Sequence, residues 1–495
     1  MSDAQPQDLV FPDEAFRARP PEAGEPRPFR LPPVQAFTLA CGIEAYLVEQ
    51  HALPLVSIDL AFPGGAAVDP PGKEGLASVC MAMLTEGTEE LDKLAYAERL
   101  ADTASSLGGY AGDDSVGLTL SSLTKHLPAT FAQLVATLRT PGFRASDFAR
   151  MIQRRIAGVR QAKGSPASVA SRVAGPVLYG PDHPFGAVTT EASLAALTLA
   201  DCRAFASRWL VPGRAQLFVV GDVTEAEVRA WFDAPALAGW AGSATPPALA
   251  APRTMPGRIF FVDIPGATQS SVSYLQLGPR RTAAGFFARQ VLGGVLGGGF
   301  TSRLNMNLRE DKGYTYGARG SFSYSQLTGA FTAGAPVAGG ATYQTILELD
   351  REIRGLASGV APITADELER EQRGTILALP GRFATAQAAL GQYRALVYFG
   401  LPLDHYDHYA ARVAEVSAGD VMAAAAAELR PDAAVYVVVG DGAAPAILRA
   451  GDHDVPYVKH GAQLTVREAL TELARGDDVR PGALIALDAD GRILG

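Results

Sequence analysis

Cysteine is scarce in this chain, and its few cysteines are too scattered to form a site by themselves. Cys41, Cys80 and Cys202 are the three in 495 residues, and no two of them have C-x-x-C spacing. That spacing is typical of thiolate zinc sites and redox pairs, and a disulfide framework needs more cysteines. The sequence therefore indicates neither a thiolate metal centre nor a disulfide framework, and it leaves a single disulfide open.

Long apolar runs and basic blocks are lacking as well. No run reaches the roughly 18 apolar residues that a membrane helix needs, and the opening MSDAQPQDLVFPDEAF does not resemble a secretion signal. The formal net charge is -9, so we do not expect nucleic acid as a partner. We expect a soluble protein without a membrane segment, in the cytoplasm as the sequence is written, or in the periplasm if a signal was removed.

What the chain does contain is an internal repeat. It is 48% apolar and 19% charged, which is ordinary for a globular protein, and it is too long for one hydrophobic core. LVPGRAQLFVVGD begins at Leu210 and LRPDAAVYVVVGD at Leu429, and the two match without a gap at a constant offset of 219 residues. Asp201 and Asp420 match at the same offset. A match of this length favours a duplication, and hence two similar domains.

Strand-like and helix-like patterns mix within the first copy. The runs GIEAYLVEQ and LPLVSIDLAFPGG are apolar in the manner of paired strands, and VGLTLSSL alternates like a half-buried strand. The segments that we predict as helices are Gly75 to Leu84, Lys93 to Leu107, Leu127 to Leu138, Ala145 to Ala162, Ser168 to Leu178 and Ala200 to Trp209.

The repeat and the composition together predict five parts of the chain. Proline-rich and glutamate-rich residues favour an extended arm at the start, and small residues with prolines favour a linker between the two copies. The C-terminal part contains the helix candidate LTVREALTELARG and a final strand-like run, GALIALDADGRIL. The predicted parts are an arm at 1–33, a first domain at 34–243, a linker at 244–256, a second domain at 257–447 and a C-terminal extension at 448–495.

One stretch of the second copy has an unusual combination of residues. GGVLGGGFTSRLNMNLREDKGYTYG, from Gly293 to Gly317, joins a glycine-rich turn to a polar run that holds Arg309 and Tyr316. The turn is formed by Gly297, Gly298 and Gly299. Each residue alone is explained by a turn, a solvated helix face or the start of a strand. The combination of these residues in one stretch is less easily explained by local structure alone.

This stretch resembles the C-terminal-domain motif of the pitrilysin or insulinase-like (M16) zinc peptidases, the family that includes mitochondrial processing peptidase. YGPDHPFG at 179–186 and the strand ending VVGDV at 219–223 resemble the first domain of that family. The resemblance implies an α+β fold: two homologous domains, each a mainly antiparallel β-sheet with helices packed on one face. The repeat found independently agrees with this expectation.

The family resemblance also shows what the chain has lost. Active members carry H-x-x-E-H on a first-domain helix, where two histidines bind zinc and a glutamate activates water, and a later helix adds a glutamate ligand. Here the surrounding frame is kept as GLASVCMAMLTEGT, but Ser78 and Ala82 stand at the histidine positions and Met81 at the glutamate position. The third ligand position falls on or near Gly158. The resemblance therefore implies no catalytic residue and no metal within this chain.

The second-domain motif, in contrast, matches the family. The Arg and Tyr of that motif contact the substrate backbone near the scissile carbonyl, and Arg309 and Tyr316 stand at those positions. A guanidinium and a phenol both donate hydrogen bonds to a carbonyl regardless of side-chain identity. The resemblance thus implies that Arg309 and Tyr316 bind substrate, with the loop of Gly297, Gly298 and Gly299 bordering the substrate path.

Three hypotheses follow. The first is a non-catalytic, substrate-binding subunit of a heterodimeric zinc metalloendopeptidase, inactive alone, whose homologous partner carries H-x-x-E-H and the zinc. The second is an inert scaffold or peptide-binding protein without a peptidase partner. The third is an enzyme with a new metal site around His405 and His408, which are spaced i, i+3 beside Asp404 and Asp407.

Overall fold

The computed structural model describes residues 14–18, 31–233, 235–476 and 484–494. The chain divides into two units, Met1–Leu31 and Pro32–Gly495. The described part of the first unit contains a 3-10 turn at Ala15–Ala18. Most of the arm predicted at 1–33 lies outside the described residues.

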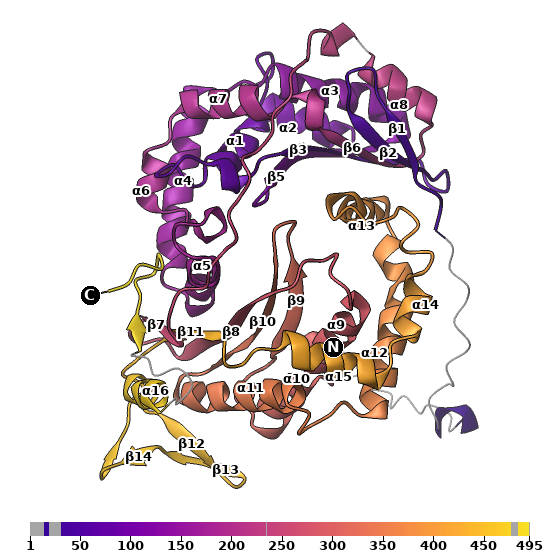
Figure 1. Ribbon diagram of the computed structural model, residues 1–495. Coiled ribbons are helices and arrows are strands. Elements are labelled where there is room, and N and C mark those ends of the chain that lie inside the picture. The colour runs from indigo at the N-terminus through magenta and orange to yellow at the C-terminus, as the bar shows by residue number, and fades with distance from the viewer. Residues whose placement is uncertain (1–13, 19–30, 234, 477–483, 495) are drawn as a thin grey trace, which may run out of the picture. The chain divides into compact units, whose positions relative to one another are not determined.

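Two six-stranded sheets organise the second unit (Figure 1). The first has the strand order β1-β2-β6-β3-β5-β4 and the second β16-β7-β11-β8-β10-β9. The strands of the first sheet are β1 Gln35–Thr38, β2 Glu44–Glu49, β3 Leu55–Pro63, β4 Ser106–Ala111, β5 Ser115–Leu123 and β6 Gln216–Gly221. The strands of the second sheet are β7 Ile259–Asp263, β8 Gln269–Gly278, β9 Arg319–Tyr324, β10 Gly329–Ala338, β11 Val435–Gly440 and β16 Ile485–Ala486.

Five strands of each sheet have the same order and the same directions. In the first sheet β2 and β6 are parallel and all other neighbours are antiparallel. In the second, β7 and β11 are the equivalent parallel pair, and β11, β8, β10 and β9 are antiparallel neighbours. The two VVGD strands are β6 and β11, at equivalent positions. The predicted fold class is confirmed, whereas the domain boundaries remain predictions.

Helices cover both sheets. Those that follow the first strands are α1 Leu76–Leu84, α2 Lys93–Asp102, α3 Leu127–Arg139, α4 Ala145–Ala162, α5 Pro166–Tyr179, α6 Glu191–Ala195, α7 Leu199–Trp209 and α8 Glu225–Phe232. Those of the second half are α9 Phe286–Gly293, α10 Arg303–Asn305, α11 Thr342–Ala357, α12 Ala365–Ala378, α13 Ala386–Tyr398, α14 Tyr409–Ala414, α15 Ala418–Glu428 and α16 Val466–Arg475. No helix in the described ranges is both long and apolar enough to cross a membrane.

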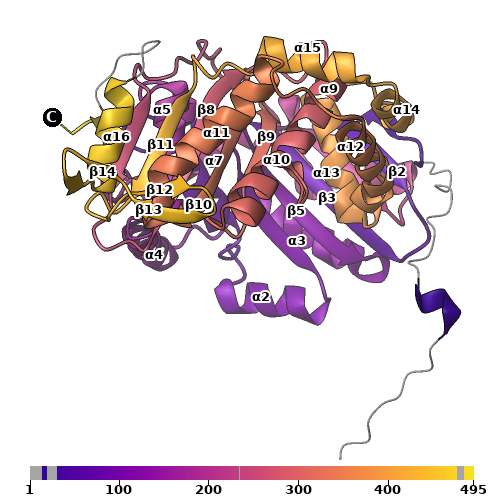
Figure 2. The same cartoon turned by 90° about the horizontal axis from the view of Figure 1, so that it is seen from below.

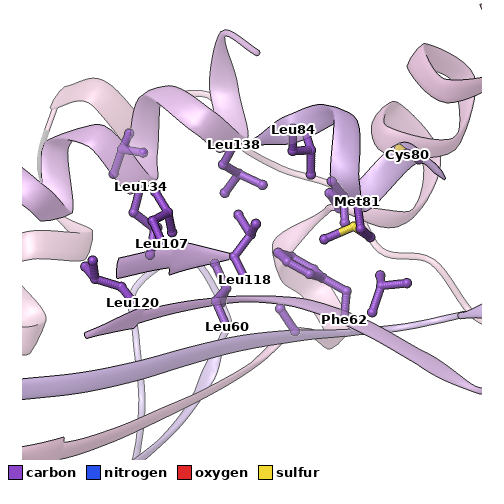
Figure 3. Packing of buried hydrophobic residues seen from close by; sticks show 14 of the residues in the cluster. Leu60, Phe62, Cys80, Met81, Leu84, Leu107, Leu118, Leu120, Leu134 and Leu138 are labelled. Atoms are coloured by element: carbon purple, nitrogen blue, oxygen red, sulfur yellow. The ribbon is translucent and has the colours of Figure 1, made fainter. Parts of the chain in front are cut away.

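The core of the first sheet lies on its helical side. Alternation along β3 places Leu60 and Phe62 on that side, where they pack with Met81 and Leu84 of α1 (Figure 3). Asp59, which precedes Leu60, points to the opposite face and is also buried, and its carboxylate contacts Arg394 of α13. The first sheet is therefore covered on both faces.

The second cover comes from an exchange of helices between the halves (Figure 1). α5, from the first half, packs on β8 and β11 of the second sheet, and α13, from the second half, lies against β3 and β6 of the first sheet. The two helices end at Tyr179 and Tyr398, which have the offset of 219 found in the sequence. The duplication thus extends to this exchange.

The C-terminal residues also belong to the second half. β16 pairs in parallel with β7, and Val466 and Leu470 of α16 are buried in the core of the second sheet. Two small antiparallel pairs precede α16, and Figure 2 shows them on the same side of the molecule as α11 and α16. Their strands are β12 Ile447–Ala450, β13 His453–Pro456, β14 Val458–Lys459 and β15 Ala462–Gln463.

Candidate functional site

The frame that resembles a zinc-binding helix folds as α1. The helix starts after Gly75, whose φ of 102° is readily adopted by glycine. The carboxylate of Asp69 accepts hydrogen bonds from the backbone N–H of Gly75 and of Ala77, each at 2.8 Å. These bonds satisfy donors that have no partner within the helix. Burial raises the pKa of Asp69 to about 6, although these backbone hydrogen bonds oppose the rise.

At the three α1 positions where active members have zinc-site residues, two side chains pack in the core and one contacts an arginine. Met81 is 1% exposed and packs in the core of the first sheet (Figure 3), and Ala82 packs against the same core. Ser78 is partly buried, and its Oγ lies 3.2 Å from Nη1 of Arg155 on α4. Burial, and then the neighbouring Arg154, lower the pKa of Arg155. A guanidinium therefore lies beside the first histidine position, where it disfavours a metal cation.

Gly158 is not brought together with these residues. It is exposed on α4, and a Cβ built there would meet nothing within 4 Å. The neighbours of Gly158 on α4 that face the core are Ile156 and Val159, and Arg155 faces Ser78. The sequence reasoning missed Arg155, although it lies one helical turn before the expected ligand position.

The residues of this region do not fit a zinc ion. A hydroxyl, a thioether and a methyl group stand where two imidazoles and a carboxylate would be needed, and they offer at most one weak ligand. Within the described ranges, no group of three or more His, Cys, Asp or Glu residues is arranged to hold a metal.

The α1 helix lies close to β4, the edge strand of the first sheet. A Cβ at Gly109 of β4 would lie 2.4 Å from the carbonyl oxygen of Met81. Only glycine permits this approach without a backbone shift. The frame has thus kept its packing against the sheet edge.

The motif of the second half begins with a π-helical turn at Gly294–Gly298, followed by α10 and a second π-helical turn at Met306–Asp311. Gly297 forms an antiparallel bridge with Gly320 of β9, and a Cβ there would lie 2.0 Å from the backbone N of Gly320. Gly298 and Gly299 are exposed. Gly297 is therefore required by close packing, while the other two form the exposed part of the loop.

Side-chain hydrogen bonds fix this loop to β9 and to the C-terminal residues. Nδ2 of Asn305 donates to the carbonyl oxygens of Gly299 and Ala318, each at 2.8 Å, and its Oδ1 accepts from the N–H of Ala318 at 2.8 Å. The hydroxyl of the buried Tyr314 donates to Oδ1 of Asp454 in β13 at 3.1 Å. The C-terminal residues therefore contact the Arg/Tyr motif.

Arg309 and Tyr316 differ in their surroundings. The guanidinium of Arg309 lies over the ring of Phe300, with its Cζ 4.2 Å from the ring centroid, and its Nε lies 3.5 Å from Oε1 of Glu310. About a third of the Arg309 side chain is exposed, at 33%. Tyr316 is 92% exposed. The aromatic ring orients the guanidinium, while the tyrosine extends into solvent.

Two further residues of this segment were missed from the sequence. Phe300 is 58% exposed and Met306 is 45% exposed, and both are large apolar residues. Together with Arg309 and Tyr316 they are residue types enriched at binding surfaces. The run FTSRLNMNLRED also contains Leu304 and Leu308, which are buried, so the sequence alone does not single out Phe300 and Met306 as exposed.

The histidines considered for a new metal site lie in unlike surroundings. The ring of His405 stacks on Phe287 with centroids 5.9 Å apart, and its Nε2 lies 3.2 Å from Nη2 of Arg281. Burial, with smaller contributions from Arg281 and Arg412, lowers the pKa of His405 to about 4. His408 is exposed, with Nε2 3.8 Å from Asp404. His405 thus belongs to an aromatic cluster, and the third hypothesis gains no support.

The two repeated halves both have an α+β fold. The first contains a zinc-type helix without metal ligands, and the second contains the Arg/Tyr segment. These features define an inactive metallopeptidase-like protein. Two models of one family match the chain: the insulinase (peptidase family M16) model at residues 46–173, and the peptidase M16 inactive domain model at 196–375. The chain belongs to the insulinase-like peptidase family M16.

Solved structures agree on the fold. A peptidase M16 inactive domain from Pseudomonas fluorescens is 26% identical, with a TM-score of 0.76 over 82% of this chain and 98% of that one. A protease from Helicobacter pylori has the same TM-score of 0.76 at 17% identity, covering 83% of this chain and 100% of its own. The periplasmic protease PqqL from Escherichia coli has a TM-score of 0.69 at 16% identity, over 89% of this chain and 47% of its own.

A curated relative adds one more likeness. The non-peptidase homolog YmxG of Helicobacter pylori is 29% identical over 113 residues, which is 23% of this chain. The match spans 26% of that relative's length. The likeness is therefore to one portion of a protein whose name excludes peptidase activity.

Proposed function

We propose that this chain is the non-catalytic, substrate-binding subunit of a heterodimeric zinc peptidase. The observation that carries the proposal is the contrast between the two sites. The zinc-type helix is buried and lacks metal ligands, whereas the segment that holds Arg309, Tyr316 and Phe300 is exposed. An Arg/Tyr surface of this kind has a use when another chain supplies the metal.

In this proposal, Arg309 and Tyr316 donate hydrogen bonds to the peptide backbone at the partner's zinc site. Both groups would stabilise negative charge that develops on the carbonyl oxygen of the bound peptide, and a zinc ion held by the partner would supply an activated water. Phe300 holds the guanidinium in place, since its ring lies beneath it. The zinc is bound by the partner, a homologous chain that carries H-x-x-E-H.

The peptide would bind by adding a strand to a sheet edge, which gives recognition of the backbone with little dependence on sequence. β4 ends the first sheet, and β9 ends the second. The edge of β9 already forms a bridge to Gly297. β4 is therefore the edge that we assign to such a peptide.

A second candidate is an inert scaffold or peptide-binding protein without a peptidase partner. The name of the Helicobacter relative, a non-peptidase homolog, favours it. In that case Arg309 and Tyr316 are remnants of an ancestral site. The compartment also stays a prediction: we propose the cytoplasm, with the periplasm as the alternative that a periplasmic neighbour in fold suggests.

The test is to purify the chain and a homologue with an intact H-x-x-E-H motif from the same organism, and to assay peptide hydrolysis separately and mixed. The proposal expects co-purification, zinc in the homologue, and hydrolysis that requires both chains. Full activity of the homologue alone contradicts it, as does zinc-dependent hydrolysis by this chain alone. Binding of peptide without any hydrolysis in the mixture supports the second candidate.

A further inference from the structure

A cavity of about 400 Å³ lies away from both the zinc-type helix and the Arg/Tyr segment. Its walls come from the end of β3, the linker, the loop between β9 and β10, and the C-terminal end of α13. Neither α1 nor the segment from Gly293 to Gly317 contributes to it. Its volume is within the roughly 300–1,000 Å³ of small-molecule sites.

One wall of the cavity is apolar. Val68 contributes from the first half, Phe185 from the turn after α5, and Pro246 and Leu249 from the linker. Such a wall buries an aliphatic or aromatic body, and burial of apolar surface is worth about 25 cal/mol per Å².

The lining of the cavity also carries more positive than negative charge. Arg214, Arg280 and Arg394 line the cavity, and Asp114 is the carboxylate among the lining residues. Asp114 accepts a hydrogen bond from the hydroxyl of Tyr398. Arg394 is also neutralised, because its Nη1 lies 3.3 Å from Oδ2 of the buried Asp59.

Two guanidinium groups remain without a carboxylate partner. Nε of Arg280 donates to the carbonyl oxygen of Leu327 at 2.8 Å, which fixes the side chain at the cavity. Across the residues that the structure describes, neither Arg280 nor Arg214 forms an ion pair with an acidic side chain. A guanidinium fork is well suited to a carboxylate, which it can bind through two parallel hydrogen bonds.

We propose that this cavity binds a small amphiphilic carboxylate. The carboxylate head pairs with Arg280 and Arg214, and the apolar tail lies against Val68, Phe185 and Leu249. The cavity is separate from the residues of the proposed peptidase function, so the two proposals stand or fall independently.

The test is isothermal titration of the full chain with sodium octanoate. Two ligands serve as controls: acetate has the head without the tail, and octylamine has the tail with a positive head. We expect one octanoate per chain and much weaker binding of both controls. No binding of octanoate, or equal binding of octylamine, overturns the proposal.

Substitutions locate the site. Arg280→Gln and Arg214→Gln should each weaken octanoate binding by about tenfold, since each removes a charged hydrogen-bond donor, and Arg280→Lys should retain part of the affinity. Leu249→Asp should abolish binding, because it places a negative charge in the apolar wall. Arg373→Gln, an exposed arginine of α12 paired with Glu369, is the matched control and should bind like wild type.

A second measurement guards against variants that bind poorly because they fold poorly. Octanoate should raise the unfolding temperature of the wild type and of Arg373→Gln, should raise that of Arg280→Gln by less, and should leave that of Leu249→Asp unchanged. An equal rise in all four proteins contradicts the assignment of the cavity.

Discussion

The zinc-type frame of α1 and the segment from Gly293 to Gly317 lie in equivalent halves of one duplicated fold, but they differ in the burial of their side chains. In the frame, Met81 is buried in the core, and Ser78 is in contact with Arg155. In the segment, Tyr316 and Phe300 face solvent. The frame is part of the protein's interior, while the segment keeps large side chains exposed.

This difference indicates that the frame is retained for its packing and not for catalysis. Its helix still closes the core of the first sheet and still packs on β4 through Gly109. Substitution in the frame should therefore affect stability, and substitution in the exposed part of the segment should affect binding.

The largest effect on stability is expected at Met81. Met81→Ala should lower the free energy of unfolding by about 2–5 kcal/mol, because it leaves a cavity in the core. Tyr316→Ala should change it by less than about 0.5 kcal/mol, since the side chain is exposed. Denaturant unfolding of both variants measures the two values. Equal losses would show that the proposed division between frame and segment is wrong.

A smaller effect is expected where the segment itself packs closely. Gly297→Ala should cost about 1–3 kcal/mol, because its Cβ would overlap the backbone of Gly320. Gly299→Ala is the matched control, since a Cβ there meets nothing within 4 Å and its φ of -147° suits alanine. Denaturant unfolding again gives the comparison. A wild-type stability for Gly297→Ala would mean that this loop is not fixed to β9.

The two regions should also respond differently to a fall in pH from 7 to 5. Burial raises the pKa of Asp69 in the frame to about 6, so the folded state binds a proton more readily than the unfolded chain. From pH 7 to pH 5 the wild type should gain about 1 kcal/mol relative to Asp69→Asn, after allowance for partial solvent exposure.

The pKa of Asp311 in the segment is shifted in the opposite direction, downward. The hydrogen bond from Lys312 lowers the pKa of Asp311, so its contribution is present above the ordinary pKa of the carboxyl and is lost as the pH falls through the lowered value. Relative to Asp311→Asn, the wild type should therefore gain nothing between pH 7 and pH 5. Unfolding curves at the two pH values test both expectations, and a gain in stability from Asp311 would contradict the second.

Much of the fold followed from the sequence because the duplication is visible in it. The VVGD match placed β6 and β11 at equivalent positions, and α1, α4 and α16 lie where apolar periodicity predicted helices. The helix predicted from Lys93 to Leu107 was too long. α2 ends at Asp102, Ala104 has a positive φ of 48°, and Leu107 lies in β4.

Other features could not be predicted, because they depend on contacts between distant residues. Nothing in the local pattern of α5 indicates that it packs on the other half's sheet. The strand-like run GALIALDADGRIL contains β16, but the pairing of β16 with β7 joins residues far apart in the chain. At the candidate site, spacing alone led to Gly158, whereas the contact to Ser78 comes from Arg155. The exposure of Phe300 and Met306 likewise depends on the loop conformation around the glycines.

The most direct test of the central claim, that the Arg/Tyr segment is half of an active site, is peptide turnover by the mixed chains with Arg309→Ala. We predict that turnover falls by about 100-fold or more, the loss typical of a missing donor at a developing oxyanion. Co-purification with the partner should be unchanged, and Arg373→Ala should turn over peptide like the wild type. Unchanged turnover by Arg309→Ala would contradict the claim.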